Sequence, residues 1–399
     1  MNHVQFSVVM DVGDATNGPR LGTLKLSESK IDTPAFMFYT KRGSVPHVSR
    51  EVFEKIIPNE QALFSFPLST NLSFYEPLKE FKHGLNKFVG LENYLSCCST
   101  IDSVLNTPRG KNQKDKVSLK TKSGNILIDY EKYMDIIEVF KPNMYVTLSI
   151  SDTDWDSSYS LIEKSVNISN RLFMSCLERH HKSEVLKGSG VIAPIQGGYN
   201  IQERIRSATF LSEYNDLLGF LFDGFFTDGT VVEDIPGNLI LPIVNKTMEC
   251  LPKDKMKIIF GAWTLDTIID LINSGMDIFD SSLPFFTTER NSALIFNYEL
   301  KYKNDIIIMD SHCCTTDQNN VDKSNSFEIC LMDTCYFEDF NPINESCSCL
   351  ACRKHTRAYI HHLLMSNELL GSLLLTIHNL HYFHQFFKDI REVLLKNNQ

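Results

Sequence analysis

Short apolar runs alternate with amphipathic stretches along most of this chain. Three strand-like runs, 6–10, 22–26 and 31–38, lie near its start and are broken by Gly, Pro, Asp and Asn. Further along, the predicted strands are 62–66, 144–150, 190–195, 219–222, 257–261 and 277–279, and the predicted helices are 44–57, 165–184, 200–212, 239–250 and 265–274. This alternation is typical of an α/β protein with parallel strands joined by helical crossovers. The number of repeats favours a β/α barrel preceded by an N-terminal β-rich segment.

Two segments interrupt this alternation. Residues 117–130 are predicted to form a hairpin, and residues 311–326 are rich in Asn, Asp, Ser and Thr, which is typical of a flexible polar loop. We therefore expect three parts, which are the barrel with its β segment over 1–310, the loop over 311–326, and a C-terminal subdomain over 327–399.

The C-terminal part contains three cysteines in close succession, Cys347, Cys349 and Cys352. A C-x-C-x-x-C pattern lets one turn of backbone bring three sulfurs to a common point, and zinc binds four such ligands in a tetrahedron. Clustered cysteines without a metal are the alternative. The density of the pattern, and the amphipathic helix predicted after it over 356–370, favour a zinc site.

Spacing leaves the fourth ligand open. Six histidines follow the cysteine pattern, namely His355, His361, His362, His378, His381 and His384. His355 lies just after Cys352, whereas His378 lies between the helices predicted over 356–370 and 380–396. A side chain at such a junction can turn back to the cysteines. His355 and His378 are therefore equal candidates by spacing.

Length and composition are those of a globular protein in a reducing compartment. The 399 residues, 43% of them apolar, leave room for a large core. The densest apolar run, 369–377, is much shorter than the roughly 18 residues of a membrane helix. The first residues lack the basic and apolar blocks of a secretory signal. Eleven cysteines in such a chain indicate reduced thiols and a cytoplasmic location.

The charge balance argues against a chain that coats nucleic acid along its whole surface. Lys and Arg number 39 against 49 Asp and Glu, which gives a net charge of −10. The two densest basic segments are 111–122 and 353–357, and each is explained most simply as a solvated surface.

The reactive groups of a β/α barrel lie where its strands end. Asp280 ends a predicted strand and has the chemistry of a nucleophile or base, with a hydrogen-bonded turn residue as the alternative. Gln196 and Gly197 follow another strand, where a small residue beside an amide lets a flat ligand approach the backbone. A tight turn explains them equally well. Asp223 is explained more simply as a turn or capping residue.

Several segments resemble the tRNA-guanine transglycosylase family. They are 33–37 (TPAFM), 196–198 (QGG), 261–263 (GAW), 275–284 (GMDIFDSSLP) and 347–380, which includes the cysteine pattern. The resemblance covers nearly the whole chain, and its cysteine region is highly specific. It implies a (β/α)8 barrel of the TIM type with a zinc-binding insertion near its C-terminal end.

The resemblance also implies the ligands and the chemistry. In that family three cysteines and a histidine hold one structural zinc ion per subunit, and these carry over to Cys347, Cys349, Cys352 and His378. The family exchanges a base in tRNA, because an aspartate attacks the ribose and expels guanine before a modified base replaces it. The position of that nucleophile matches Asp280.

Other family positions are changed. Cys98 stands where the second catalytic aspartate is expected, and Ser149 and Ile150 replace an Asp-Glu pair whose aspartate reads the purine. Asp223 replaces the first glycine of a Gly-Gly pair beside the base. Losing a positioned acid or base costs about a hundred- to ten-thousand-fold in rate. Asp280 is therefore expected to be a vestigial nucleophile, and no catalytic residue is assigned.

This pattern is similar to the non-catalytic members of the family. It implies a heterodimer with a catalytic queuine tRNA-ribosyltransferase subunit, which acts on the GUN-anticodon tRNAs for Asp, Asn, His and Tyr. A homodimer, an active transglycosylase that uses Asp280, and a queuine-binding protein that uses Gln196 and Gly197 are the alternatives. The resemblance also implies a peripheral association with the mitochondrial outer membrane, beside the cytoplasmic location.

Overall fold

The computed structural model describes residues 3–11, 17–57, 62–105, 112–113, 115–225, 229–312 and 327–396. These residues form two compact units. The first comprises Met1–Gly43 and Gln61–Asp280, and the second comprises Ser44–Glu60 and Ser281–Gln399.

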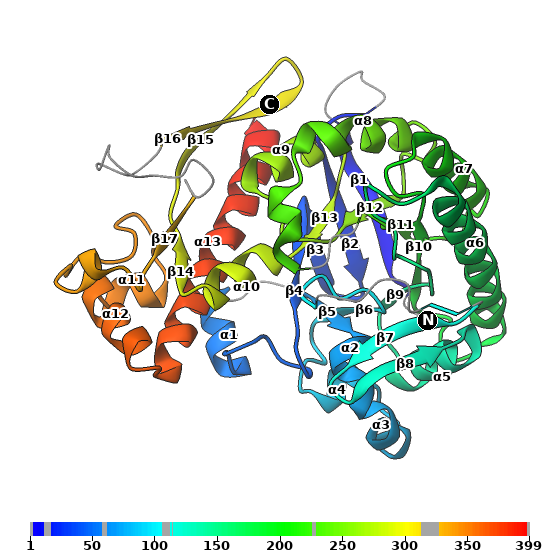
Figure 1. Ribbon diagram of the computed structural model, residues 1–399, viewed down its shortest axis with the longest axis horizontal. Coiled ribbons are helices and arrows are strands. Elements are labelled where there is room, and N and C mark those ends of the chain that lie inside the picture. The colour runs from blue at the N-terminus through cyan, green and yellow to red at the C-terminus, as the bar shows by residue number, and fades with distance from the viewer. Residues whose placement is uncertain are drawn as a thin grey trace. The chain divides into compact units, whose positions relative to one another are not determined.

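The first unit is a closed barrel, as the alternation of strands and helices predicts (Figure 1). Its parallel strands follow one another in the order β10-β11-β12-β13-β4-β5-β6-β9. Their bounds are β4 Ala35–Tyr39, β5 Leu63–Pro67, β6 Leu95–Ser99, β9 Met144–Val146, β10 Gly190–Ile195, β11 Gly219–Phe222, β12 Met256–Ile259 and β13 Ile278–Asp280. The ring closes where β13 pairs with β4, with Ile278 opposite Ala35.

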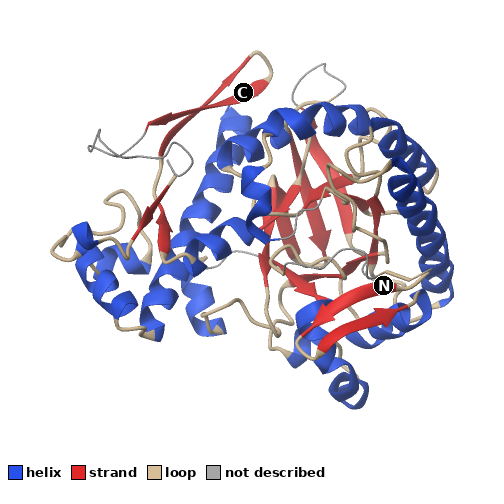
Figure 2. Ribbon diagram, in the orientation of Figure 1, coloured by secondary structure: helices blue, strands red, loops and turns tan. Residues whose placement is uncertain are grey.

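Helices surround these strands (Figure 2). They are α5 Tyr130–Phe140, α6 Tyr159–Lys182, α7 Ile201–Ser212, α8 Gly237–Met248 and α9 Leu265–Asn273, and each packs against the next. Side chains of Asp129, Ser158, Asn200 and Thr264 accept hydrogen bonds from backbone N–H groups at the starts of α5, α6, α7 and α9. Such caps satisfy donors that a helix leaves unpaired, which is why these helices begin where they do.

Shorter elements join the early strands. Between β5 and β6 the chain forms α2 Leu68–Asn71, α3 Tyr75–Phe81 and α4 Leu85–Phe88. The predicted hairpin is present as β7 Val117–Thr121 and β8 Gly124–Ile128. One strand is shorter than predicted, because the sheet holds only β9 of the run 144–150. Leu148 and Ile150 are buried outside the sheet, and an apolar run alone does not separate a strand from a buried coil.

An antiparallel sheet of β1 Gln5–Asp11, β2 Arg20–Leu26 and β3 Ser29–Thr33 precedes the barrel. Leu24 and Ile31 of this sheet belong to the same apolar cluster as barrel residues such as Met144 and Met256. Met144 and Met256 begin their strands. The sheet therefore covers the amino-terminal end of the barrel and leaves the carboxyl-terminal end for a site.

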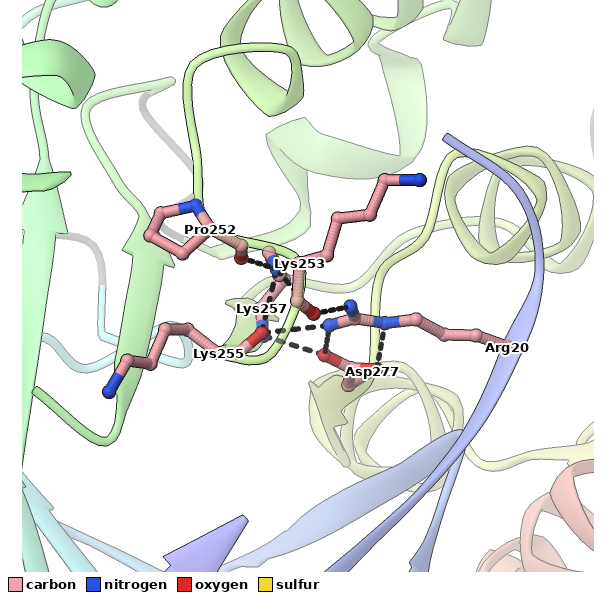
Figure 3. Close-up of polar contacts among 6 residues, drawn as sticks. All are labelled: Arg20, Pro252, Lys253, Lys255, Lys257 and Asp277. Carbon is pink, nitrogen blue, oxygen red and sulfur yellow. Dashed lines mark hydrogen bonds and ion pairs between the residues drawn. The ribbon is translucent and has the colours of Figure 1, made fainter. Parts of the chain in front are cut away.

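A buried ion pair fastens this sheet to the barrel (Figure 3). Arg20 Nε donates to Asp277 Oδ1 at 2.9 Å, and Arg20 Nη2 donates to the carbonyl of Lys255 at 2.8 Å. Asp277 also accepts a hydrogen bond from the backbone N–H of Lys257 at 2.7 Å. Both charged side chains are thus paired and hydrogen-bonded, as burial requires.

The second unit is built around one long helix, α13 Leu369–Lys396. Around it lie α1 Arg50–Ile56, α10 Ser282–Glu289, β14 Ser292–Leu294, β17 Glu328–Cys330, η4 Thr334–Tyr336, α11 Leu350–Lys354 and α12 Arg357–Met365, together with the hairpin of β15 Asn297–Lys303 and β16 Ile306–His312. Residues 313–326 of the predicted loop lie outside the described residues.

The predicted junction around His378 is wrong, because His378 lies inside the continuous helix α13. The chain breaks earlier, after α12, where Asn367 adopts a positive φ of 54°. Asparagine tolerates this left-handed conformation at the end of a helix. No helix among the residues described above is both long and apolar enough to cross a membrane.

Candidate metal centre and barrel mouth

Asp280 is the last residue of β13, at the carboxyl-terminal mouth of the barrel. Its side chain is buried and accepts hydrogen bonds from Ser103 Oγ and, at 3.2 Å, from the backbone N–H of Gly261. The strand end thus holds this carboxylate where a barrel enzyme holds a reactive group.

A second buried carboxylate, Asp102, lies beside Ser103 in the chain, and sequence reasoning missed it. It accepts hydrogen bonds from Ser69 Oγ and from the backbone N–H of Val104 at 3.2 Å. Burial raises the pKa of Asp102, and these hydrogen bonds oppose that rise. Its position after β6, three residues beyond the strand's end at Ser99, is the signal that identifies it, because residues there face the mouth.

Cys98, at the position expected for the second catalytic aspartate, lies within β6 and is fully buried. Burial raises the pKa of its thiol well above the ordinary value. The thiol is therefore neutral and does not replace a carboxylate as a proton acceptor.

Asp223 follows β11 and forms the centre of a buried network at the mouth. Its Oδ2 atom accepts hydrogen bonds from Ser149 Oγ at 3.3 Å, from Ser151 Oγ and from Gln196 Nε2. Its Oδ1 atom accepts one from the N–H of Gly224 at 2.7 Å. Burial raises the pKa of Asp223, while these hydrogen bonds lower it. Asp223 therefore does more than shape a turn, because it joins three strand ends.

Gln196 and Gly197 are committed to the fold. Gln196 is completely buried and its amide N–H group donates to Asp223. Gly197 has a φ of +132°, and a Cβ there would lie 2.6 Å from the backbone nitrogen of Arg204. Only glycine allows α7 to begin so close to β10.

Arg204 supports the same network from α7. It donates to the carbonyls of Gly198 at 2.7 Å and Ile195 at 2.9 Å, and its guanidinium lies 3.7 Å from the ring centroid of Phe225. Burial lowers its pKa to about 9, so it remains a cation at neutral pH. Its charge faces the Asp223 carboxylate and helps to keep an anion in this buried place.

In the second unit, Cys347, Cys349, Cys352 and His378 form a group whose ligand atoms all lie within 4.8 Å of one another. His378 Nδ1 lies 3.7, 3.6 and 3.2 Å from the sulfurs of Cys347, Cys349 and Cys352. A tetrahedral zinc ion with standard bond lengths places sulfur and nitrogen ligands about 3.6 Å apart. The group can hold a metal ion, and it fits a zinc site.

Neighbouring groups fix these four side chains. His378 Nε2 lies 2.8 Å from the carbonyl of Leu294, so that Nε2 carries the proton and Nδ1 is left as the ligand atom. Cys349 caps α11 and accepts a hydrogen bond from the N–H of Cys352 at 3.3 Å. Hydrogen bonds with Cys347 and Cys352 lower the pKa of the Cys349 thiol, while hydrogen bonds with Cys347 and Cys349 raise the pKa of the Cys352 thiol, so Cys349 is the first of the two to become a thiolate.

Asn379, which the sequence did not single out, orients this centre. It accepts a hydrogen bond from the N–H of Leu294 at 2.8 Å and donates to the carbonyl of Ser292 and to Thr288 Oγ1. It thereby ties β14 and α10 to the turn of α13 that carries His378.

The other histidines near the cysteine pattern have different partners. His355 stacks on Tyr359 with centroids 5.4 Å apart. His361 Nδ1 lies 2.8 Å from the carbonyl of Leu331, and His381 Nδ1 lies 3.1 Å from the carbonyl of Ile56. Within the described part of the chain, the structure brings only His378 of these to the three cysteines.

Comparison with known proteins agrees with this geometry. The family model described as queuine tRNA-ribosyltransferase matches residues 14–399. A Culex quinquefasciatus protein named queuine tRNA-ribosyltransferase accessory subunit 2 is 36% identical over 378 residues, which are 93% of this chain and 84% of that protein. Proteins of the same name from Aedes aegypti and Drosophila melanogaster are 34% and 33% identical, over 94% and 96% of this chain and 86% and 87% of theirs. The chain belongs to the queuine tRNA-ribosyltransferase family.

Proposed function

We propose that this chain is the non-catalytic subunit of a heterodimeric queuine tRNA-ribosyltransferase. In that complex a catalytic homologue exchanges guanine for queuine at the wobble position of tRNAs with GUN anticodons. The network around Asp223 carries the proposal, because it places a buried carboxylate at the barrel mouth and binds that carboxylate to neighbouring side chains. A purine entering there finds the Asp223 oxygens already bound to Ser149, Ser151 and Gln196. The relatives named accessory subunits support the same function.

The metal in this proposal is one structural zinc ion per subunit. Three sulfurs and one imidazole nitrogen make a closed set of four ligands, which leaves no position for a substrate. The ion would join α11 to α13 and supply on the order of 10 kcal/mol to the folding of the second unit.

The surface offered to the catalytic subunit lies at the end of α12 and the start of α13. Tyr359, Met365 and Leu369 are 41%, 56% and 84% exposed, and Leu370 beside them is also exposed. A contiguous patch of exposed apolar side chains is typical of a protein contact, and we infer that these residues form such a patch. Tyr359 also stacks on His355, just after the cysteine pattern, so the metal centre would hold this surface in shape.

Reconstitution tests the proposal. The purified chain is mixed with a catalytic homologue, and exchange of labelled guanine in a GUN-anticodon tRNA is measured for each subunit and for the pair. We expect exchange only when the catalytic subunit is present, and at least about tenfold more exchange for the pair. We also expect that Asp280→Asn in this chain changes nothing. Turnover by this chain alone that Asp280→Asn abolishes would establish the active transglycosylase instead.

That second candidate rests on one observation, which is that the mouth has two buried carboxylates besides Asp223, namely Asp280 and Asp102. A covalent base exchange needs a carboxylate nucleophile and a second group that moves a proton. A queuine-binding protein is less well supported, because the amide nitrogen of Gln196 is already engaged by Asp223 and its oxygen, although it has no hydrogen-bond partner, is buried.

A further inference from the structure

The first unit contains a hollow whose described lining includes no residue of the Asp223 network. It has a volume of about 1000 Å³. The loop after β4, the segment of α2 and η1 (Leu72–Phe74) after β5, and the hairpin of β7 and β8 surround it. Since β4 and β5 contribute the residues at their carboxyl ends, the hollow opens on the face of the barrel where sites are found.

Basic side chains dominate the charge of this hollow. Lys41 and Arg42 come from the loop after β4, and Lys120 and Lys122 come from the hairpin. Lys41, Arg42 and Lys122 are exposed. Among the described residues that line it there is no Asp or Glu, although acids outnumber bases in the chain as a whole. We call these four residues and their surroundings the basic hollow.

The remaining lining is hydroxylic or apolar. The hydroxyl groups belong to Ser69, Thr70, Ser73, Thr121 and Ser123, and the apolar side chains are Leu72, Leu105 and Ile126. Ser69, Thr70 and Thr121 already donate to Asp102, to the carbonyl of Pro67 and to the carbonyl of Gly124, so their oxygens are left to accept from ribose hydroxyls. The hydroxyls of Ser73 and Ser123 can donate to phosphate oxygens. Apolar surface between them suits the faces of a sugar or a base. No Asn, Gln, Asp or Glu side chain of the described lining is available to read a base edge.

The hairpin that carries two of the cations is braced. Thr121 pairs with Gly124, so the loop has two residues, Lys122 and Ser123. Thr121 Oγ1 donates to the carbonyl of Gly124 at 2.7 Å, and the φ of Gly124 is +118°. At its other end the hairpin is held by an ion pair of 3.2 Å between Lys116 and Asp129, and β7 packs against α2. The cations are therefore held over the end of β5 rather than on a free loop.

We propose that the basic hollow binds the sugar–phosphate backbone of an RNA strand, and this inference rests on the proposed function. Cations with hydroxyls and no acids match a chain of phosphates and riboses better than a folded protein surface, which presents both charges. Lys, Arg, Ser and Thr can also contact base edges. The contact proposed here is to phosphates and riboses, and such contacts position the RNA without selecting its sequence. The chain thus adds affinity for tRNA that is uniform across tRNAs, while the catalytic subunit recognises the base.

Charge neutralisation tests the proposal. The variant Lys41→Gln/Arg42→Gln/Lys122→Gln is compared with a matched control, Lys25→Gln/Lys87→Gln/Lys164→Gln, whose lysines are exposed elsewhere on the first unit. Binding of an unmodified GUN-anticodon tRNA transcript is titrated against salt, for the chain alone and for the pair with the catalytic subunit. Three lost phosphate contacts lower the slope of log K against log salt by about 2. We expect this change, with affinity at least about tenfold weaker at low salt, only in the first variant.

Ultraviolet crosslinking adds a direct readout. In the wild-type chain we expect crosslinked peptides that contain Lys41 and Arg42 or the 120–123 turn, and equal yields with a transcript of a non-GUN anticodon. An unchanged salt slope in the first variant overturns the proposal. The proposal is also overturned if the first variant keeps its affinity for tRNA and instead loses binding to anionic lipid vesicles or to polyglutamate, because the basic hollow then binds a different anionic ligand.

The two proposals fail separately. A wild-type chain that does not associate with the catalytic subunit contradicts the proposed function, and the titration of the chain alone still decides whether the basic hollow binds RNA. A pair that forms and exchanges base equally well with either variant, at equal salt slopes, contradicts the basic hollow alone.

Discussion

Asp223 shows how one residue changes the chemistry of a barrel mouth. The family pattern has a glycine there, which leaves space beside the base, whereas the carboxylate of Asp223 collects hydrogen bonds from Ser149, Ser151 and Gln196. The sequence identified the substitution as a departure from the family. It gave no account of the network, because these three partners lie 74, 72 and 27 positions from Asp223 along the chain and no local pattern connects them.

Removing the carboxylate leaves buried donors without an acceptor. We expect Asp223→Ala to lower the free energy of unfolding by about 2–4 kcal/mol, and Asp223→Asn to cost less because its amide oxygen still accepts. Urea unfolding of both variants measures the difference. The exposed Asp254→Ala is the matched control, and equal midpoints for Asp223→Ala and this control would contradict the role assigned to the network.

At the scale of elements, α13 carries most of what organises the second unit. His378 and Asn379 lie in successive positions, one toward the cysteines and the other toward β14 and α10. The cysteine pattern predicted a metal group from the sequence, because its spacing is local. The break at Asn367 was misplaced because the helical pattern of 356–370 and the apolar run of 369–377 give no strong stop signal.

Disruption of the metal group should destabilise this unit. We expect His378→Ala and Cys349→Ala each to bind less than about one tenth of the wild-type zinc and to lower Tm by about 10 °C or more, since metal binding and folding are coupled. Metal analysis and thermal unfolding measure both. The exposed His362→Ala on α12 should keep its zinc and Tm, and wild-type stability without zinc would show that the metal is not structural. Association of His378→Ala with the catalytic subunit is expected to weaken too.

At the scale of the whole molecule, the alternation of strands and helices was enough to predict the barrel, because each crossover unit carries its own periodicity. The pairing that fastens the N-terminal sheet was not predictable. Arg20 and Asp277 are 257 positions apart, and neither has a distinctive neighbour in sequence. Long-range polar pairs of this kind are set by the assembled fold.

Breaking one side of this pair leaves a buried charge. We expect Arg20→Met to lower the free energy of unfolding by about 3–5 kcal/mol. The double variant Arg20→Met/Asp277→Asn should recover part of that loss, because the lone anion is gone and the amide oxygen still accepts from Lys257. Denaturant unfolding provides both values, with the exposed Lys25→Met on β2 as control. A double variant as unstable as the sum of its parts would mean that the two side chains do not interact.

The closure of the ring by β13 against β4 has a consequence for biosynthesis. β4 ends at Tyr39 and so leaves the ribosome long before its second neighbour, β13, which ends at Asp280. The segment 44–60, between β4 and β5, belongs to the second unit. Its packing partners in that unit are therefore made only after residue 280. A nascent chain of this protein thus carries an open, unsealed sheet until Asp280 has been made, and the second unit is completed only after that.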